Sequence, residues 1–382
     1  MVVATARALK PFSAAAAVST ARAATASTIS TSAMAPVPSS SSTYTIRAVA
    51  AFARNLLRFG CRNVTVRGLD RFLAQLHSAE RTASSRGLLT YCNHISVLDE
   101  PTIWGTLPAS TFRDPRTVRW TLGASDIMFT NSMLARFFRN GQCIETHRGG
   151  GIYQKAIDEA ISKLNTANWV HLFPEGYVNV STSSRLRRFK WGIARMLLEA
   201  ERLPTVVPIW ITGFDRMMPE PRAKPKWLPR FGNDVSITFG EPVTDQLAPV
   251  VEAIRATNDI APQHLLPEEL RFDPASINHA DPDAVIADRS VPTQLATEWN
   301  TASLFQRPLE AGDDSRLALA RSQLAALLRY HLGLVAVQQR TADAYPNPQE
   351  DAQLVHTESL NPQKQHAQNN VLRDGQRKKT GV

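Results

Sequence analysis

Short apolar runs alternate with helical patterns from about residue 62 to residue 255, and this alternation limits the chain to one fold class. Helical periodicity occurs over 131–139, 152–164 and 191–201. Strands that alternate with helices are typical of an α/β domain. We therefore predict a single α/β domain over residues 61–256, with a central mixed or parallel sheet flanked by helices. The runs with the composition of buried strands are 88–92, 143–146, 169–173, 205–210 and 235–239.

The segments outside this domain differ from it in composition. Residues 1–43 are rich in Ala, Ser and Thr and contain no acid, as in a mitochondrial transit peptide; a disordered tail without a targeting role is the alternative. Residues 257–316 are acidic and lack clear periodicity, which predicts a polar insertion or linker. Helical spacing returns over 317–341, and the polar residues 342–382 are expected to be disordered.

Residues 44–60 have the pattern of an amphipathic helix. Apolar side chains recur at helical spacing, while Arg47, Arg54 and Arg58 fall on the opposite side. Such a helix can lie in a membrane interface, with its arginines at the lipid phosphates. A helix that packs on the domain's own core would show the same pattern, so the sequence leaves both roles open.

The formal charge of +9 indicates a partner only once it is located along the chain. Residues 1–69 contain eight Lys or Arg and no acid, so 9 − 8 leaves the other 313 residues at +1. A nucleic-acid binder carries its excess charge on a folded face, so we expect no nucleic-acid partner. Cys61, Cys92 and Cys143 form no CxxC pair, no metal pattern and no even disulfide set, and no metal or other cofactor is expected. No apolar run reaches the 18 or so residues of a spanning helix.

The strongest chemical signal is Asn93-His94-Ile95-Ser96-Val97-Leu98-Asp99, directly after the strand 88–92. His94 and Asp99 can meet only if His94 precedes a helix and Asp99 lies in its first turn. Asp99 would then orient one imidazole nitrogen and stabilise the imidazolium, leaving the other nitrogen to deprotonate a hydroxyl. No Gly-x-Ser-x-Gly occurs, which favours attack by a substrate hydroxyl over a serine acyl-enzyme. Alone, the pair could equally be two residues that cap local backbone.

Phe173-Pro174-Glu175-Gly176 follows the strand 169–173, at the carboxyl end where α/β sheets place their ligands. Pro174 and Gly176 would form a turn that directs the Glu175 carboxylate into the crevice. There it could hold a glycerol hydroxyl or order the His94 loop. An ordinary turn glutamate is the plain alternative.

Two basic features suit phosphate. Arg148-Gly149-Gly150-Gly151 opens the helix 152–164, and glycines at a helix start expose N–H groups to an anion. Lys190 closes a compact basic group that also contains Arg187. Both features could instead be solvated surface.

Four pieces in this order resemble the four sequence blocks of the glycerophosphate and lysophosphatidate acyltransferase superfamily: His94…Asp99, Gly141…Arg148, Phe173–Gly176 and Pro208. Within it the chain is similar to the tafazzins, the cardiolipin-remodelling transacylases. Details that carry this similarity are Asp99-Glu100-Pro101, the stretch from Arg148 to Lys155, and Val178-Asn179 after the Glu-Gly. Acyl-CoA-using relatives commonly have Thr-Arg where this chain has Tyr177-Val178.

The resemblance implies CoA-independent acyl exchange between a phospholipid and a lysophospholipid, with cardiolipin and monolysocardiolipin as substrates. It implies peripheral binding to mitochondrial inner and outer membranes, facing the intermembrane space. The implied catalytic residues are His94 and Asp99, and the implied substrate-binding residues are Arg148, Glu175, Gly176, Asn179 and Lys190. An acyl-CoA-dependent lysophospholipid acyltransferase is the nearest alternative, and a lipid-binding protein without turnover is a third.

Overall fold

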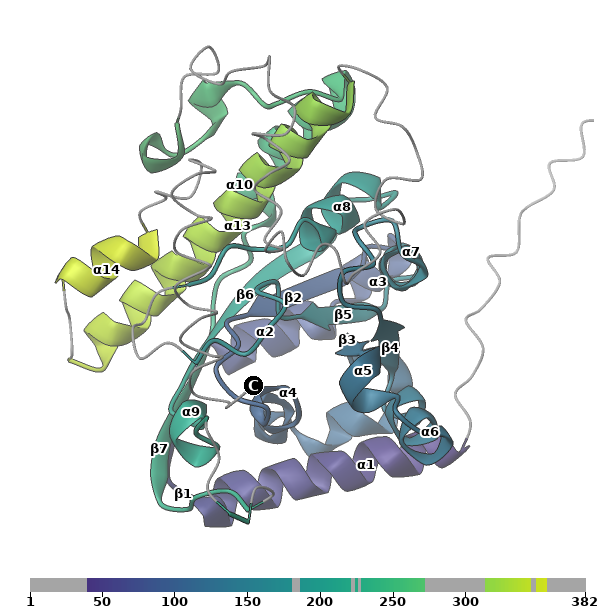
Figure 1. Cartoon of the computed structure of the whole chain (residues 1–382), viewed down its shortest axis with the longest axis vertical. Coiled ribbons are helices and arrows are strands. Elements are labelled where there is room, and N and C mark those ends of the chain that lie inside the picture. Colours follow the sequence, from purple (N-terminus) through teal and green to yellow (C-terminus); the bar gives the residue numbers. More distant parts are fainter. Residues whose placement is uncertain are drawn as a thin grey trace, which may run out of the picture. The chain divides into compact units, whose positions relative to one another are not determined.

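The computed structural model describes residues 40–180, 186–220, 224–225, 228–271, 313–344 and 348–355. It contains a seven-stranded sheet with the order β1-β7-β6-β2-β5-β3-β4 (Figure 1). The strands are β1 (Cys61–Arg67), β2 (Leu88–Cys92), β3 (Trp120–Ala124), β4 (Cys143–Thr146), β5 (Trp169–Leu172), β6 (Thr205–Thr212) and β7 (Asn233–Phe239). The α-helices within the described residues are α1 (Ser40–Asn55), α2 (Leu69–Leu76), α3 (Ala79–Ala83), α4 (Asp99–Ile103), α5 (Ser125–Met128), α6 (Ser132–Asn140), α7 (Lys155–Asn165), α8 (Gly192–Glu199), α9 (Phe214–Met217), α10 (Thr244–Thr257), α13 (Asp313–Ala342) and α14 (Pro348–Val355).

The direction of the strands determines where a site can form. The five strands β6, β2, β5, β3 and β4 run parallel to one another. β7 runs antiparallel to β6 and pairs in parallel with the edge strand β1. The prediction of one α/β domain with a mixed sheet is therefore confirmed. The five predicted strands correspond to β2, β4, β5, β6 and β7, and β1 and β3 were not expected. Five parallel carboxyl ends lie along one edge, where α/β sheets bind ligands.

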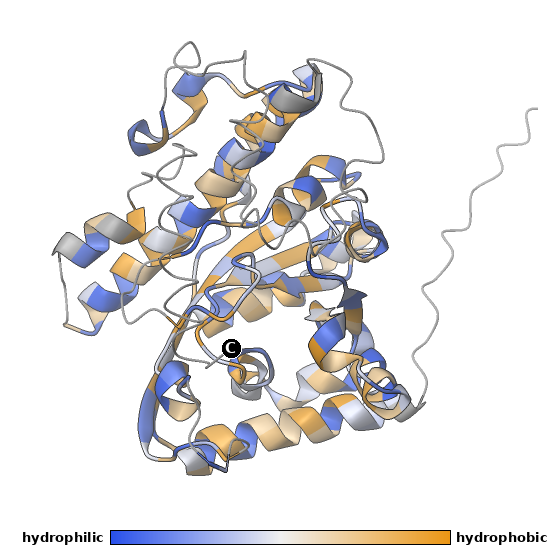
Figure 2. Ribbon diagram, viewed as in Figure 1, coloured by the Kyte–Doolittle hydropathy of each residue, from blue (hydrophilic) through white to orange (hydrophobic). Residues whose placement is uncertain are grey.

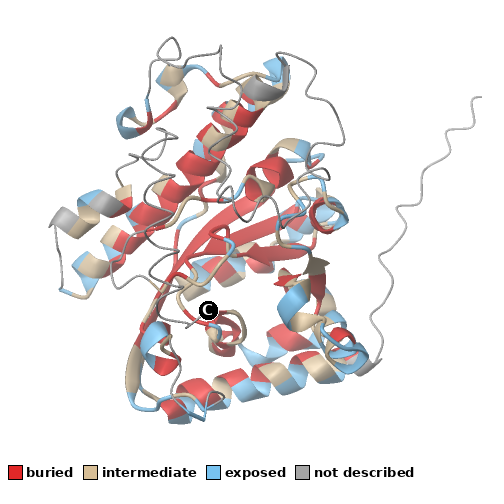
Figure 3. Cartoon of the chain, in the orientation of Figure 1, coloured by how far each residue is buried: buried red, intermediate tan, exposed pale blue. Residues whose placement is uncertain are grey.

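The core has two layers because successive side chains of a strand point to opposite faces of the sheet. In β2, Leu89 and Tyr91 belong to a cluster that also includes side chains of α7, α8, α10 and α13. Leu88 and Cys92 belong to a second cluster, which includes side chains of α1, α2 and α4. The central strands β2 and β5 are buried along their length (Figure 3), and apolar residues predominate in the sheet (Figure 2). The sheet is therefore covered by helices on both faces.

Helix α1 packs its apolar stripe onto this second cluster. Ile46, Ala50 and Ala53 are buried, and the chain continues through a π-helical turn, Leu56–Gly60, into β1. Gly105 allows the close approach, because a Cβ there would lie 2.8 Å from the carbonyl carbon of Ala53. The apolar stripe of residues 44–60 thus covers the domain's own core. Any membrane contact would have to use the opposite side of α1.

Helix α13 is tied to the sheet by buried polar contacts. The Tyr91 hydroxyl donates to the carbonyl oxygen of Leu328 at 2.9 Å. The Gln339 side chain accepts from Thr238 of β7 at 2.7 Å and donates to Thr212 of β6 at 3.2 Å. The predicted helix 317–341 thus extends over Asp313–Ala342 and contributes to the core of the α/β domain that bears the site.

Parts of three predicted segments lie outside the described residues: 1–39, 272–312 and 356–382. Among the residues that the structure describes, no helix has the length and apolarity needed to cross a bilayer. No group of three or more His, Cys, Asp or Glu side chains in the described ranges is placed to hold a metal ion.

Candidate active site

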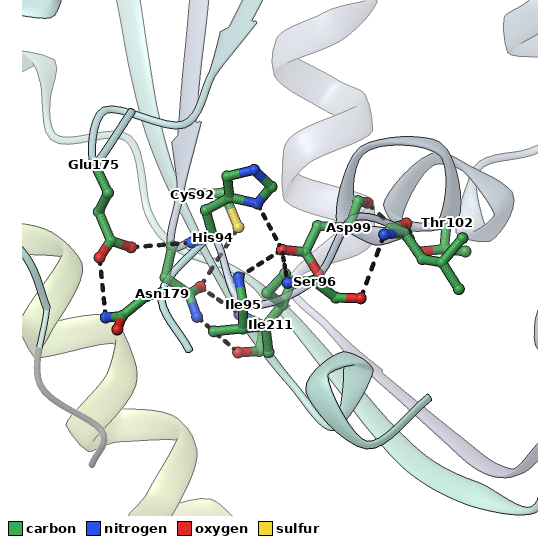
Figure 4. A network of polar contacts seen from close by, with 11 residues as sticks. Cys92, His94, Ile95, Ser96, Asp99, Thr102, Glu175, Asn179 and Ile211 are labelled. Carbon is green, nitrogen blue, oxygen red and sulfur yellow. Dashed lines mark hydrogen bonds and ion pairs between the residues drawn. The ribbon is translucent and has the colours of Figure 1, made fainter. Parts of the chain in front are cut away.

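His94 and Asp99 meet in the turn between β2 and α4. The Nδ1 atom of His94 lies 2.9 Å from Oδ2 of Asp99 (Figure 4). The same oxygen accepts the backbone N–H groups of Ile95 at 2.6 Å and Ser96 at 2.8 Å. Asp99 opens α4, as the sequence required, so the aspartate both organises the turn and orients the imidazole.

The two side chains differ in exposure. The Asp99 side chain is completely buried, whereas that of His94 is 20% exposed. Burial raises the pKa of the Asp99 carboxyl above its ordinary value, and the hydrogen bonds from His94, Ser96 and Ile95 oppose this rise. With Nδ1 directed at the carboxylate, the second ring nitrogen faces away from Asp99 (Figure 4). This arrangement suits a base that takes a proton from a substrate on its open side.

Glu175 holds the His94 turn in place through hydrogen bonds to its backbone and to the neighbouring loop. Its carboxylate is buried and accepts the His94 backbone N–H at 3.0 Å through Oε1. Its Oε2 accepts from the Asn179 side chain at 3.1 Å and from the Arg187 backbone N–H at 2.9 Å. Burial raises the pKa of Glu175, and these backbone hydrogen bonds oppose the rise. Of the two roles predicted for Glu175, this geometry supports the ordering of the His94 loop.

Gly176 and Asn179 shape the same turn. Gly176 has a φ of +75°, and a Cβ there would lie 3.3 Å from Cγ of Lys190. The Asn179 backbone N–H donates to the carbonyl oxygen of His94 at 2.6 Å. The Lys190 N–H donates to the Pro174 carbonyl oxygen at 2.8 Å. In this structure the predicted binding residues Asn179 and Lys190 support the loops around His94.

Asn93 anchors the turn from the other side, a role that the sequence reasoning missed. Its amide nitrogen donates to the carbonyl oxygen of Ile211 at 2.9 Å, and its amide oxygen accepts the Ile211 N–H at 2.9 Å. This paired contact fastens the end of β2 to β6. A polar side chain directly after a buried strand was the only sequence signal for it.

Arg148 and Lys190 are brought together around one aromatic ring. Their charged ends lie 5.2 Å and 5.9 Å from the ring centroid of Tyr177. Arg187, which the sequence placed in the same basic group as Lys190, lies 5.5 Å from the same centroid. Tyr177 follows Gly176 directly, so this cation cluster of Arg148, Arg187 and Lys190 adjoins the His94 turn. Arg148 also contacts Asp126, with 3.2 Å between Nη1 and Oδ2. Three cations gathered in this way have the charge and the donors that suit a phosphate.

Comparisons with known proteins agree with this arrangement. A family model described as "Acyltransferase" matches residues 64–212, which include the His94 turn, the Glu175 turn and β6. The "N-acylphosphatidylethanolamine synthase" of Arabidopsis thaliana is 35% identical over 209 residues, which cover 54% of this chain and 72% of that protein. The chain belongs to the acyltransferase family. The resemblance predicted from the four sequence blocks is thereby confirmed, together with the enzyme class of an acyltransferase.

Relatives named tafazzin fall in the same group. The "Tafazzin" of Saccharomyces cerevisiae is 35% identical over 243 residues, which cover 54% of this chain and 63% of that protein. The "Taffazin" of Dictyostelium discoideum is 39% identical over 182 residues, which cover 47% of this chain and 61% of that protein. The matched part thus spans less than two thirds of these two relatives. A looser match among solved structures is the LPA acyltransferase PlsC of Thermotoga maritima, which is 21% identical with a TM-score of 0.37; it covers 53% of this chain and 68% of that one.

Proposed function

We propose that this acyltransferase moves acyl chains between phospholipids and lysophospholipids without CoA, with His94 as the general base. The observation that carries the proposal is the His94–Asp99 contact at 2.9 Å, set beside the cation cluster on Tyr177. A base and a phosphate seat side by side suit a substrate whose reacting hydroxyl lies a few atoms from a phosphate. A lysophospholipid is such a molecule.

The proposed reaction needs one base. His94 takes the proton from the lysophospholipid hydroxyl while its oxygen attacks the ester carbonyl of the donor phospholipid. Asp99 stabilises the imidazolium that forms. The tetrahedral intermediate then collapses, the donor's glycerol oxygen leaves, and His94 returns the proton to it. The products are a new phospholipid and a new lysophospholipid, so neither CoA nor a metal is required.

The charges around Tyr177 bear on the substrate. Three cations suit a headgroup with more than one phosphate better than a single phosphodiester, because each added phosphate brings another negative charge. Cardiolipin and monolysocardiolipin fit this description, and several relatives are named tafazzin. We therefore take them as the proposed donor and acceptor pair, remodelled at mitochondrial membranes that face the intermembrane space.

Membrane contact is proposed for the outer side of α1. Tyr44 and Phe52 of α1 are 73% and 55% exposed, and Phe59 of the following π-helical turn is 72% exposed. The exposed Arg47 and Arg58 flank them, and no acid occurs before Asp70. Exposed aromatic rings next to arginines suit the headgroup region of an anionic bilayer. Peripheral association through this side would bring the site to its lipid substrates.

Two measurements test the proposal. Purified protein is incubated with cardiolipin and labelled lysophospholipid in the absence of CoA, and transfer of acyl chains is followed. Wild-type protein should transfer them, and His94→Ala should abolish transfer while its circular dichroism stays unchanged. Transfer that begins only when acyl-CoA is added would instead favour the acyl-CoA-dependent alternative, and an active His94→Ala protein would reject the assignment of the base. Vesicle binding without turnover under any donor would favour a lipid-binding protein.

The plant relative, of which this chain covers 72%, favours a second acceptor, an amine. The plant protein is named for a product in which the acyl chain is carried by the amine of phosphatidylethanolamine. His94 could accept the proton of an amine nucleophile as well as that of a hydroxyl. Labelled phosphatidylethanolamine as the acceptor in the same assay separates the two, because only the amide product resists mild alkaline hydrolysis.

A further inference from the structure

Phe173 lies between two histidines at the carboxyl end of β5. Its ring stacks on the imidazole of His94, with ring centroids 4.2 Å apart and an interplanar angle of 23°. It also meets the ring of His171 at 90°, with centroids 4.8 Å apart. The strand that carries the Glu175 turn thus presents an aromatic face directly to the base.

His171 gives Phe173 a rigid support. It is completely buried, and its Nδ1 lies 2.8 Å from the hydroxyl of Thr90, which also accepts from Trp169 Nε1 at 2.9 Å. The ring of Trp104 packs against it at 84°, with centroids 4.7 Å apart. Burial lowers the pKa of His171 well below its ordinary value, so this imidazole stays neutral at physiological pH. It therefore acts on Phe173 by packing.

Asp99 alone does not fix the plane of the His94 ring. The carboxylate contacts one edge atom, Nδ1, and a ring held at one edge can still rock about that contact. A contact on the face of the ring removes this freedom. The two contacts together determine where the second nitrogen points, which is the atom that must meet the substrate proton. An aromatic face also favours the positive charge that His94 acquires during transfer.

We propose that Phe173 is a positioning residue, which holds the plane of the His94 imidazole and favours its protonated form in the transition state. Phe173 acts through His94 and makes no contact of its own with the reacting atoms. This inference rests on the proposed role of His94 as the base. It adds a third element to the His94–Asp99 pair, supplied from a different strand.

Replacement of the ring tests the proposal. Phe173→Leu and Phe173→Met remove the aromatic face, and Phe173→Tyr keeps it. In the CoA-free transfer assay, we expect kcat of the Leu and Met proteins to fall about 10-fold or more, a part of what a well-placed base contributes, with KM changed by less than about 2-fold. The Tyr protein should recover most of kcat. Phe72→Leu, a buried ring that packs on Trp169 and Phe239, is the matched control and should leave both constants close to wild type.

A second readout does not depend on turnover. The ring nitrogens of His94 are followed by proton–nitrogen NMR and assigned by comparison with His94→Ala. Wild-type protein and Phe173→Leu should both carry the proton on Nδ1, where Asp99 accepts it. The His94 ring signals of Phe173→Leu should broaden, because a ring held only at Nδ1 can rock. If the wild-type protein transfers no acyl chain, the proposed function fails while these spectra still decide the role of Phe173.

The proposal is overturned by either of two results. One is a Leu or Met protein with wild-type kcat and His94 ring signals as sharp as those of the wild type. The other is an unchanged kcat with a raised KM, which would place Phe173 in contact with the substrate. Should the Leu protein fail to fold, the Met protein, which keeps more of the side-chain volume, carries the same comparison.

Discussion

The substitution Glu175→Gln tests whether Glu175 supports the loops around His94 or binds the substrate. Three donors surround the buried carboxylate: the backbone N–H groups of His94 and Arg187 and the side-chain amide of Asn179. Glutamine has nearly the same shape but only one acceptor oxygen. Its NH2 group must therefore face at least one donor. The less costly arrangement turns the NH2 group toward His94, because the other would oppose two donors.

The size of the effect follows from these contacts. A hydrogen bond to a charged acceptor contributes about 1.5–3 kcal/mol, and relief from burying the charge offsets a part of its loss. Burial does raise the pKa of Glu175, so that relief is real. We expect a net cost of about 2 kcal/mol. This corresponds to a roughly 30-fold shift away from the ordered His94 loop and to a fall in Tm of roughly 4–8 °C.

The assay combines thermal unfolding with steady-state kinetics. Glu175→Gln should lower both Tm and kcat and leave KM nearly unchanged, and Glu175→Ala should do so more strongly because it removes all three contacts. Glu252→Gln, on the exposed side of α10, is the control and should change none of these quantities. A wild-type Tm together with a raised KM would refute the reasoning, since Glu175 would then contact the substrate and not the loops.

Three further predictions concern other residues. Asp99→Asn should lower kcat by roughly 10³–10⁴-fold, because an amide cannot both accept from His94 Nδ1 and replace the carboxylate charge; a kcat within about 10-fold of wild type would contradict the pairing. Burial lowers the pKa of His331 to about 4, so the unfolded chain binds a proton below about pH 6.5 that the folded chain does not. The free energy of unfolding should therefore fall by about 2 kcal/mol between pH 7 and pH 5 from this residue, and urea unfolding of His331→Leu should lack this part of the fall. Gly105→Ala places a Cβ 2.8 Å from the Ala53 carbonyl carbon; displacement of α1 should cost about 1–3 kcal/mol in the same assay, and an unchanged urea midpoint would show that α1 does not pack so closely.

The fold was predictable where strands are buried on both faces. The run 88–92 is buried at every position and matches β2 in both bounds. β1 was missed because it lies at the edge of the sheet, contains the adjacent exposed residues Arg62 and Asn63, and has no fully buried residue. β3 was missed because it ends in Gly123 and Ala124, which have low strand propensity, and because three of its five residues are only half-buried. A strand of small or polar residues is specified by the strands that it pairs with, and β1 and β3 pair with strands far along the sequence, β7 and β5.

The site divides in the same way. His94 and Asp99 are five residues apart, so chemistry and helix geometry sufficed to pair them. The contacts of Glu175 with His94 and of Phe173 with His94 join segments about 80 residues apart along the chain, and no spacing rule reports them. For residues 44–60, a buried helix and an interfacial helix have the same sequence pattern. The packing of the apolar stripe on the second cluster, with Ala53 against Gly105, distinguishes them.

The His94–Asp99 contact has a consequence for variation in this enzyme. The contact joins two residues of one short turn. Substitutions elsewhere can therefore shift or tilt the turn, but they hardly change the distance between His94 and Asp99. Substitutions outside the turn should accordingly lower activity in part, because they displace His94 from the substrate while its contact with Asp99 persists. Loss that is complete in a single step should be confined to changes inside the turn. Natural or engineered variants of this chain could thus be sorted by how much activity they retain.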